Sequence, residues 1–261
     1  MISAVCVYNN EKILNNYLLK SLKNQTADYE IITLDNTQGK YKSAAEALNY
    51  GGRKAKGGYI MFVHQDIILG SDLWIEKAEK ILDRLPNFGI AGVAGRCEND
   101  EGVITNIEHG IPKRVAGEIH IKKPIKVQTL DECLIIIPRF VFSLLQFDEK
   151  VCNDWHLYAV DYSLSIRRLG YNVYAVPMYV YHLSTGFKLI GKLERILRGP
   201  LPRGYYISLK KVLKKHKNYY EKIYINSGTY RTIYPVFLQR AQSIIKNRLK
   251  LLFKKIKVKK V

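Results

Sequence analysis

A histidine, a glutamine and an aspartate directly follow an apolar stretch of the sequence. Residues Tyr59–Val63 are mostly apolar, His64, Gln65 and Asp66 come next, and the apolar character resumes at Ile67–Leu69. Nothing after Asp66 resembles a turn, so the local hydrogen bonding that favours Asp in turns does not explain it. Burying an unpaired carboxylate is costly. Because hard cations such as Mg²⁺ bind carboxylate and phosphate oxygens together, we predict a divalent metal ion at Asp66.

The sequence has none of the other common phosphate-binding motifs. Neither G-x-x-x-x-G-K-[ST] nor G-x-G-x-x-G follows the first predicted strand, which argues against a P-loop or a dinucleotide-binding Rossmann site. No G-x-S-x-G nucleophile elbow is present either. A phosphate group would therefore be held through a cation at Asp66.

Apolar runs alternate with amphipathic segments and predict an α/β fold. The predicted strands are 2–8, 30–35, 59–63, 88–95 and 133–138, and the predicted helices are 11–22, 43–56, 71–85, 141–147 and 160–170. Strands and helices in alternation imply a mostly parallel sheet flanked by helices. Such sheets bind ligands at the carboxyl ends of their strands.

Three of the predicted strands end in polar residues. These ends are Tyr8-Asn9-Asn10-Glu11, Asp35-Asn36-Thr37 and His64-Gln65-Asp66. Because the carboxyl ends of adjacent parallel strands meet at one edge of the sheet, we expect them to line a single crevice. Ordinary caps and turns remain an alternative explanation for Asn9, Asn10, Asn36 and Thr37.

The composition limits the class of protein. The 261 residues suffice for one large α/β domain or two small ones. The four cysteines include no C-x-x-C pair, which fits neither a zinc ribbon nor a disulfide framework and indicates a reducing, cytoplasmic environment. The first residues lack the features of a signal peptide. No run of about 18 apolar residues predicts a membrane-spanning helix.

The positive charge is confined to the C-terminal region. Residues 1–187 carry 21 Lys and Arg against 21 Asp and Glu, whereas residues 188–261 carry 21 against 2 and account for the formal net charge of +19. We therefore predict a body at 1–187 and a basic helical extension at 188–261. From Pro235 onward an apolar helical stripe is flanked by cations, which is typical of a helix on an anionic membrane surface. The tyrosines at 205, 206, 219, 220, 224, 230 and 234 suit the same boundary.

Other interpretations of this extension stay open. An apolar helical stripe is often a core or a dimer interface, and a basic tail can bind nucleic acid. The neutral body and the absence of a recognised nucleic-acid-binding module argue against nucleic acid. We therefore expect a cytoplasmic protein that associates peripherally with the inner face of the cell membrane.

Five segments together resemble the glycosyltransferase family 2 type of GT-A enzyme. They are "VYNNE", "LDNTQG", "AAEALNYGGRKAKGGYIMFVHQDI", "FDEKVCNDWHLYAVDYSLSIRRLGYNVYAVP" and "VYHLSTG", in order from Ile2 to Gly186, about 70 % of the chain. The resemblance is strongest to a branch in which the usual D-x-D motif is written H-Q-D. It implies a Rossmann-like GT-A fold and an inverting, metal-assisted transfer of a sugar from a nucleoside diphosphate sugar to a hydroxyl of a glycan or lipid-linked acceptor.

The resemblance also implies roles for individual residues. Asp66 matches the last Asp of D-x-D and would ligate Mn²⁺ or Mg²⁺, and His182 matches a histidine that completes the metal site in many relatives. Asp35 would accept the imide N–H of a uracil or thymine base, which favours a UDP- or dTDP-sugar. The implied donor-binding residues are Tyr8, Asn9, Glu11, Asp35, Asn36, Asn49, Gly52, Arg53, His64 and Gln65.

The first departure from the family pattern is His64, which stands where D-x-D has its first Asp. An imidazole can donate to a hydroxyl or ligate a metal, but it adds no negative charge, so metal affinity would be weaker. A hydrogen bond from His64 to a neighbouring loop is the alternative role.

The second departure removes the usual catalytic carboxylate pair. Aligning "DYSLSIR" with the family's D-L-S-L-R helix puts Tyr158 and Ala159 where the pair is expected. An inverting transfer still needs a base within hydrogen-bond reach of the acceptor hydroxyl. The predicted catalytic residues are Asp161 and, as its substitutes, Asp154 and His156, and Trp155 is predicted to stack on the acceptor sugar. Asp161 could instead favour the helix macrodipole, and Trp155 could be core.

These two departures keep a second hypothesis open. The body could be a GT-A-like domain that binds a nucleotide sugar or a glycan without turning it over. A sugar nucleotidyltransferase is a further alternative, but the segment after the first strand is not the Gly-rich, basic loop that those enzymes carry.

Overall fold

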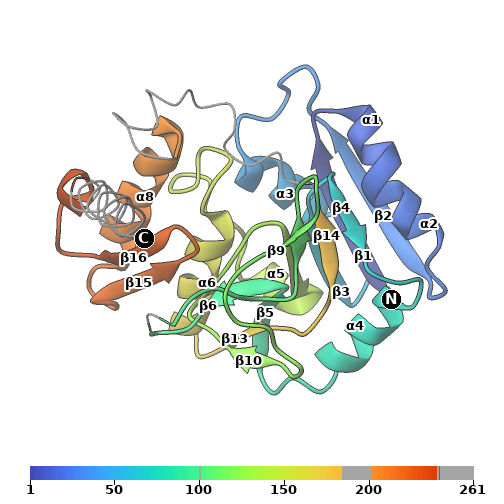
Figure 1. The fold of residues 1–261 in the computed structure, drawn as a ribbon. Helices are drawn as coiled ribbons and strands as arrows, with labels where there is room; N and C mark the ends of the chain where they lie inside the picture. The colour runs from blue at the N-terminus through green and yellow to red at the C-terminus, as the bar shows by residue number, and fades with distance from the viewer. Residues whose placement is uncertain (100, 184–200, 240, 242–261) are drawn as a thin grey trace, which may run out of the picture.

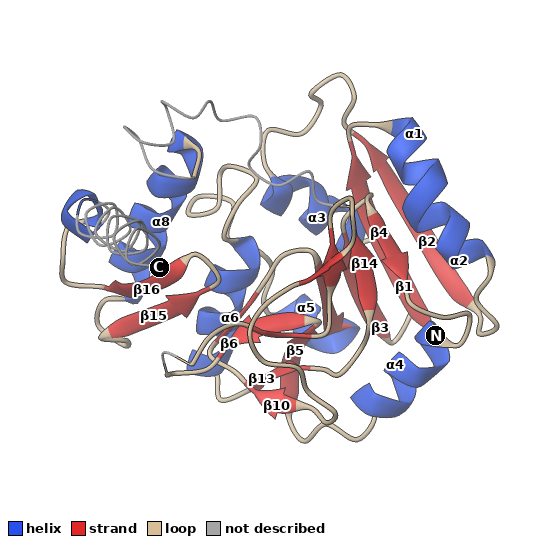
Figure 2. Ribbon diagram, viewed as in Figure 1, coloured by secondary structure: helices blue, strands red, loops and turns tan. Residues whose placement is uncertain are grey.

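The computed structural model describes residues 1–99, 101–183, 201–239 and 241. Its centre is a seven-stranded sheet with the order β10-β13-β5-β12-β3-β1-β2 (Figures 1 and 2). In that order the strands are Ile125–Lys126, Asn172–Ala175, Phe88–Gly92, Leu134–Pro138, Tyr59–Val63, Ile2–Tyr8 and Tyr29–Asp35. Five of them run in one direction, and β12 and β10 run in the other. The predicted mainly parallel α/β sheet is confirmed.

The direction of β12 matters for the site. This strand is antiparallel to both of its neighbours, β3 and β5, and its first residue, Leu134, pairs with Val63 at the end of β3. The residues that precede β12 therefore lie at the same edge of the sheet as the residues that follow β1, β2 and β3.

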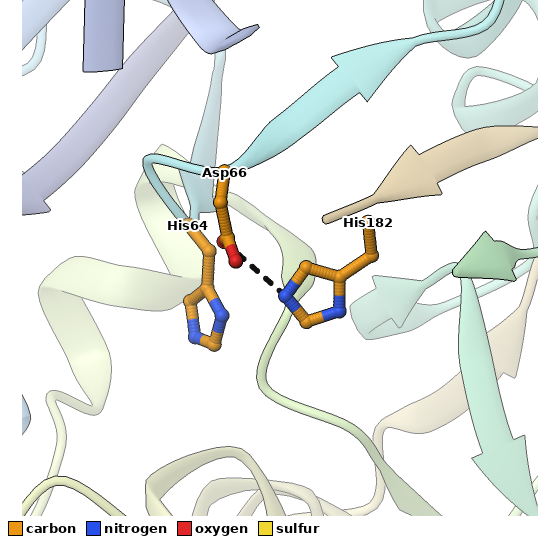
Figure 3. Close-up of side chains that lie close together, drawn as sticks. All are labelled: His64, Asp66 and His182. Atoms are coloured by element: carbon orange, nitrogen blue, oxygen red, sulfur yellow. Dashed lines mark ion pairs between the residues drawn. The ribbon is translucent and has the colours of Figure 1, made fainter. Parts of the chain in front are cut away.

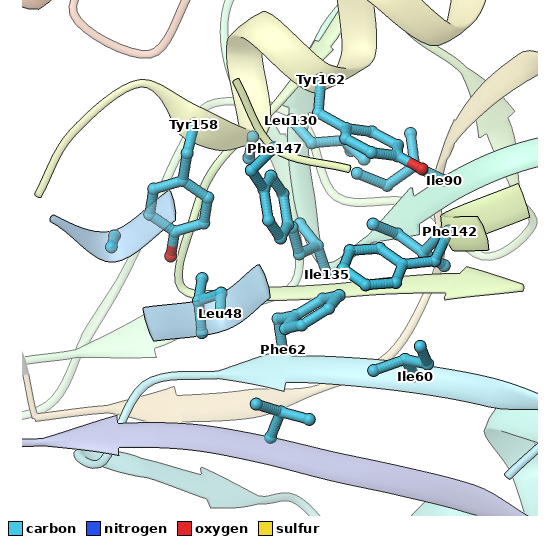
Figure 4. Close-up of a cluster of buried hydrophobic side chains, with 14 of the residues drawn as sticks. Leu48, Ile60, Phe62, Ile90, Leu130, Ile135, Phe142, Phe147, Tyr158 and Tyr162 are labelled. Atoms are coloured by element: carbon cyan, nitrogen blue, oxygen red, sulfur yellow. The ribbon is translucent and has the colours of Figure 1, made fainter. Parts of the chain in front are cut away.

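Helices cover both faces of the sheet. One face carries α1 (Glu11–Leu14), a π-helical turn (Asn15–Leu19), α2 (Lys20–Lys23) and α4 (Trp74–Leu82), and the other carries α3 (Ala44–Gly52), α5 (Arg139–Leu144) and α6 (Tyr158–Arg168). Successive residues of β1 serve the two cores in turn, because side chains alternate across a strand: Ala4 and Cys6 pack under the first set and Val5 under the second. Figure 4 shows the aromatic centre of the second core, around Phe62 and Phe147.

The helix starts follow from capping side chains. Asn10 precedes α1 and accepts the N–H of Ile13 at 3.0 Å, and Ser43 precedes α3 and accepts the N–H of Glu46 at 3.1 Å. α3 ends at Gly52, earlier than the predicted residue 56. A Cβ on Gly52 would come within 2.5 Å of the Phe142 ring, so this glycine lets α3 pack closely against α5.

Two smaller sheets lie beside the edge at which β3 ends. One joins β4 (Ile67–Leu69), β14 (Val180–His182), β8 (Glu108–His109) and β9 (Arg114–Val115), and the other joins β11 (Thr129–Leu130), β6 (Ala94–Arg96) and β7 (Ile104–Thr105). The predicted strand at 88–95 is thus divided between β5 and β6. β14 pairs with β4 and places His182 opposite Ile67. Ile67 directly follows the predicted metal ligand Asp66, so His182 comes close to that ligand.

The described part of the C-terminal region is not helical throughout. α8 (Arg203–His216) is followed by a hairpin of β15 (Lys222–Ile225) and β16 (Gly228–Arg231), and these elements share a core with α6. Tyr205, Tyr224 and Tyr230 are only 8 %, 8 % and 9 % exposed. Their predicted place at a membrane boundary is corrected, because they pack inside the protein.

The predicted amphipathic helix from Pro235 lies, except for residues 235–239 and 241, outside the described residues. None of the helices in the described ranges combines the length and apolar character that crossing a bilayer requires.

Candidate functional site

Three side chains that can ligate a metal ion lie together at the ends of three strands. His64 and Asp66 flank the turn between β3 and β4, and His182 ends β14. One ligand atom of each residue lies within 4.8 Å of those of the other two. His182 Nε2 is 3.2 Å from Asp66 Oδ1, as Figure 3 shows. The side chains of Asp66 and His182 are 21 % and 20 % exposed, so a ligand can reach them from solvent.

The pKa values of the two histidines of this cluster shift in opposite directions. Burial lowers the pKa of His64, and the neighbouring His182 lowers it further, so the His64 imidazole is neutral at pH 7. Burial also opposes the charged forms of Asp66 and His182. Their mutual hydrogen bond and opposite charges outweigh burial, which leaves the pKa of Asp66 lowered and that of His182 raised.

Helix α6 orients His64. The Nε2 of His64 lies 3.3 Å from the hydroxyl of Tyr158, the first residue of α6. That hydroxyl donates its own hydrogen to the backbone oxygen of Glu132 at 3.1 Å, so it accepts from His64. The neutral ring then carries its proton on Nε2 and leaves the lone pair of Nδ1 to bind a metal ion.

The ends of β1 and β2 bring several predicted donor-binding residues to the same edge. Tyr8 and Asp35 are paired in register, and hydrogen bonds from Thr37 and from Tyr8 lower the pKa of Asp35. The Gln65 amide accepts the N–H of Asn9 at 3.2 Å and donates to the Asn9 side chain at 2.7 Å. Gln65 therefore ties the β1 loop to the metal-ligand turn.

Two more donor-binding candidates belong to the loops at this edge. Glu11 begins α1, and Asn36 accepts the N–H of Tyr41 at 2.7 Å, which fixes the loop after β2. Asn36 is engaged in the turn role that the sequence left open for it.

A model described as "Glycosyltransferase like family" matches residues 3–182. The chain belongs to this family. The predicted enzyme class, a glycosyltransferase, is thereby confirmed at the level of the family. A search of curated proteins found no match.

Two solved structures share the fold of this glycosyltransferase. The mannosyltransferase PcManGT from Pyrobaculum calidifontis, in complex with GDP-Man and Mn²⁺, is 14 % identical with a TM-score of 0.53, over 82 % of this chain and 63 % of that one. GalNAc-T7 with UDP, GalNAc and Mn²⁺ is 11 % identical with a TM-score of 0.56, over 82 % of this chain and 48 % of that one. The glycosyltransferase thus has the predicted GT-A fold and spans less than two thirds of either relative.

Three predicted donor-binding residues are engaged in contacts within the protein. Asn49 is 2 % exposed, and its amide is bonded to the backbone of Phe147 and to Glu149. Gly52 packs against α5, and Arg53 donates to Gln146 at 2.9 Å. Their role in donor binding stays a prediction.

Asp161 is also placed differently from its predicted role as the base. Its side chain is 2 % exposed, and it lies 2.7 Å from Lys215 Nζ and 2.9 Å from His216 Nε2, both on α8. Each carboxylate oxygen is thus bound by a side chain of α8. The geometry gives Asp161 a structural role that joins α6 to α8.

The loop before α6 carries the remaining predicted residues. Asp154 accepts the N–H of Trp155 at 2.7 Å, and the Trp155 ring is 37 % exposed. His156 lies against Tyr205, with ring centroids 5.6 Å apart, and burial lowers its pKa. Trp155 is open to a ligand, whereas His156 is partly covered by α8.

Two carboxylates at the site edge were missed by the sequence analysis. Asp131 and Glu132 come just before β12, and Asp131 lies in the field of both His64 and His182. Burial, with the charge of Asp131, raises the pKa of Glu132 to about 8. In the sequence, Asp131 and Glu132 are an acid pair that precedes a buried strand. Such a pair points to the site edge only if that strand is antiparallel to its neighbours.

Proposed function

We propose that this glycosyltransferase transfers a sugar from a nucleoside diphosphate sugar to a hydroxyl of a glycan or lipid-linked acceptor, with inversion and with the help of Mn²⁺ or Mg²⁺. The observation that carries the proposal is the convergence of His64, Asp66 and His182 at the strand ends of a GT-A fold, with their ligand atoms within 4.8 Å of one another.

The donor set fits a divalent ion of this kind. One carboxylate and two imidazoles would leave room for diphosphate oxygens, and Mn²⁺ accepts both nitrogen and oxygen ligands. When bound, the ion would supply positive charge to the departing diphosphate. Asp66 contributes the only negative charge of the three, and the Tyr158 hydroxyl keeps His64 in its ligating orientation. The two similar structures contain Mn²⁺ with a nucleotide or nucleotide sugar, which supports this choice.

The nucleotide would lie over the ends of β1 and β2. Asp35 is ionised at neutral pH and open to solvent, so it can accept the imide N–H of uracil or thymine. Tyr8, beside it, and the Asn9–Gln65 pair would border the base and the ribose. This arrangement favours a UDP- or dTDP-sugar.

The reaction follows from these positions. The acceptor hydroxyl oxygen forms a bond to the anomeric carbon, and the bond between that carbon and the β-phosphate oxygen breaks from the opposite face, which inverts the configuration. The nucleoside diphosphate leaves with the electron pair, and a base takes the hydroxyl proton. Asp161 does not fit this role, because Lys215 and His216 engage it. Asp154, His156 and the newly found Asp131 are the remaining candidates.

The test is metal-dependent turnover of a panel of nucleotide sugars. We expect slow release of UDP or dTDP in Mn²⁺, none in EDTA, and faster release when an acceptor is present. Binding of the nucleotide sugar without release would support a domain that binds donor but does not transfer it. Release that is unaffected by EDTA would contradict the metal assignment.

We also propose a peripheral contact with an anionic membrane surface. Ile233, Tyr234, Phe237 and Leu238 are 67 %, 48 %, 69 % and 47 % exposed, and the sequence after them is rich in Lys and Arg. Apolar residues next to cations favour such a surface. The chain should sediment with vesicles that contain anionic lipid and lose this binding when residues 235–261 are removed. Equal binding to neutral vesicles would contradict the proposal.

A further inference from the structure

A pocket of about 270 Å³ opens beside the metal-ligand cluster. His182 forms one wall, Asp131 another, and Asn226, in the turn between β15 and β16, borders it from the C-terminal hairpin. The remaining walls come from β6, β7, β8 and the segment around Gly117. Its size is at the small end for ligand sites, which suits one ring rather than a chain of rings.

The pocket lies on the opposite side of the cluster from the predicted nucleotide-binding residues. Across the sheet, Asp35 ends β2, Tyr8 ends β1, Asp66 follows β3, Asp131 precedes β12, and Ala94 follows β5. The nucleotide residues, the metal ligands and the pocket therefore occur in that order along one edge. An acceptor in the pocket would approach the donor sugar from the side away from the nucleotide, as inversion requires.

Asp131 is held with its carboxylate at the pocket. Its Oδ1 accepts the N–H of Cys133 at 3.0 Å, and its Oδ2 accepts the side-chain N–H of Asn226 at 2.7 Å. Each carboxylate oxygen can accept a second hydrogen bond, so capacity remains for an acceptor hydroxyl. Two fixed donors also remove the freedom of the side chain to turn away.

The C-terminal hairpin that supplies Asn226 is anchored to the body. Gln128 donates to the Lys222 backbone oxygen at 3.0 Å and accepts the N–H of Tyr224 at 2.8 Å, and Thr129 donates to the Tyr224 oxygen. The hairpin lies beyond residues 3–182, which match the family. A segment outside the family match thus completes a wall of the pocket.

We infer that this pocket is the acceptor subsite and that Asp131 is the base, an inference that rests on the proposed function. The acceptor hydroxyl gives its proton to Asp131 as its oxygen bonds to the anomeric carbon and the nucleoside diphosphate departs. Asn226 is a positioning residue that holds Asp131 and closes the pocket.

The lining also defines the chemical class of the acceptor. Glu118 and Asp131 are acidic, Thr105, His109 and Asn226 are polar, and no lysine or arginine lines the pocket among the described residues. A negatively charged ring would meet the like charges of Glu118 and Asp131, and neither a lysine nor an arginine of the lining is there to pair with it. The acceptor is therefore a neutral sugar or polyol ring rather than a uronic acid or a phosphorylated ring.

The experiment compares full-length wild type with Asp131→Asn and Asn226→Ala, with Asp28→Asn on the far surface as the matched control. UDP binding with Mn²⁺ is measured by calorimetry. Transfer from a panel of UDP- and dTDP-sugars is measured by mass spectrometry, with neutral methyl hexosides and the corresponding methyl uronides as acceptors.

Asp131→Asn should bind UDP with Mn²⁺ as wild type does and lose at least about 100-fold in transfer, the usual size of a base contribution. Asn226→Ala should raise the acceptor KM roughly 10-fold with a smaller change in kcat, because a hydrogen bond to a charged group is lost. Asp28→Asn should match wild type, and the neutral hexosides should be used in preference to the uronides.

Three results would overturn the inference. One is transfer by Asp131→Asn at wild-type rate, and another is loss of UDP binding in that variant while it melts at the wild-type temperature. The third is a wild type that binds UDP with Mn²⁺ but uses no neutral ring or uses the uronides equally well. A wild type that does not bind UDP, dTDP or their sugars at all would instead refute the proposed function.

Discussion

Two aspartate–histidine pairs in the described part of the chain have different surroundings. Asp66 lies 3.2 Å from His182, and both side chains are about one-fifth exposed. Asp161 lies 2.9 Å from His216, with exposures of 2 % and 0 %. Lys215 Nζ lies 2.7 Å from the other carboxylate oxygen of Asp161.

The two pairs differ in how much of the carboxylate remains free to bind a ligand. Both oxygens of Asp161 are engaged by side chains of α8, Lys215 and the fully buried His216, so this carboxylate has no oxygen free for a ligand. At Asp66 one internal hydrogen bond leaves ligand capacity facing solvent, and His64 adds a further lone pair nearby. The same residue types therefore hold helices together in one place and are proposed to bind a metal in the other.

The largest expected effect is on the buried pair. Asp161→Ala leaves the buried His216 Nε2 without its partner and removes one of the two carboxylates that pair with Lys215, the other being Asp148. The change should remove about 3 kcal/mol from the free energy of unfolding. For a chain of this size the melting temperature should fall by roughly 10 °C. Thermal unfolding followed by circular dichroism measures this, with the exposed Asp28→Ala as the control. A melting temperature equal to that of the control would remove the structural role of Asp161.

The open pair should respond in the opposite way. Asp66→Ala should change stability by less than about 1 kcal/mol, because the pair is partly solvated. Metal-dependent release of nucleoside diphosphate should fall at least about 100-fold, since a direct ligand is lost. Turnover assays in Mn²⁺ and EDTA, together with thermal unfolding, separate the two effects. Wild-type turnover by Asp66→Ala, or a melting temperature as low as that of Asp161→Ala, would contradict the proposed difference between the two pairs.

Much of the fold could be predicted from the sequence, because strand and helix patterns are local. The ends of β1, β2 and β3 and the metal ligand candidates at 64, 66 and 182 follow from apolar runs and a family pattern. The partners of Asp161 could not be predicted, because Lys215 and His216 are more than 50 residues away. The local sequence pattern also cannot show that the Asn49 amide donates to the backbone oxygen of Phe147, which is 98 residues away.

The largest omission has one physical cause. The strand 133–138 was expected to be buried, which it is, but its direction depends on the order of the whole sheet. Because β12 is antiparallel, its amino end brings Asp131 and Glu132 to the site edge. The rule that parallel sheets bind ligands at the carboxyl ends of their strands cannot point to residues that precede a strand.

A smaller effect is expected from Glu132, whose carboxyl lies in the field of the neighbouring Asp131. Its pKa of about 8 exceeds the unfolded value of 4.5, so its contribution favours the folded state at low pH and is lost as pH rises through 8. Wild type should lose about 1 kcal/mol between pH 7 and pH 9, a few degrees in melting temperature. Glu132→Gln keeps the acceptor for the Leu157 N–H and should lose less over that range. Parallel pH profiles would contradict the assignment.

The smallest effect belongs to a fully solvated pair. Lys80 and Glu76 lie one turn apart on α4 at 2.5 Å, with side chains 67 % and 42 % exposed. Glu76→Gln should change the free energy of unfolding by only about 0.3 kcal/mol, and less in high salt. Denaturant unfolding at two salt concentrations measures this. A loss near that of Asp161→Ala would show that exposure does not set the ranking of these pairs.

The position of bound Mn²⁺ tests the central claim most directly. Crystals grown with UDP and MnCl₂ should show an anomalous difference peak at about 2.0–2.3 Å from Asp66 and from at least one of His64 and His182, with diphosphate oxygens completing the shell. A peak elsewhere in the molecule, or UDP bound at the β1 and β2 ends with no peak at this cluster, would contradict the account.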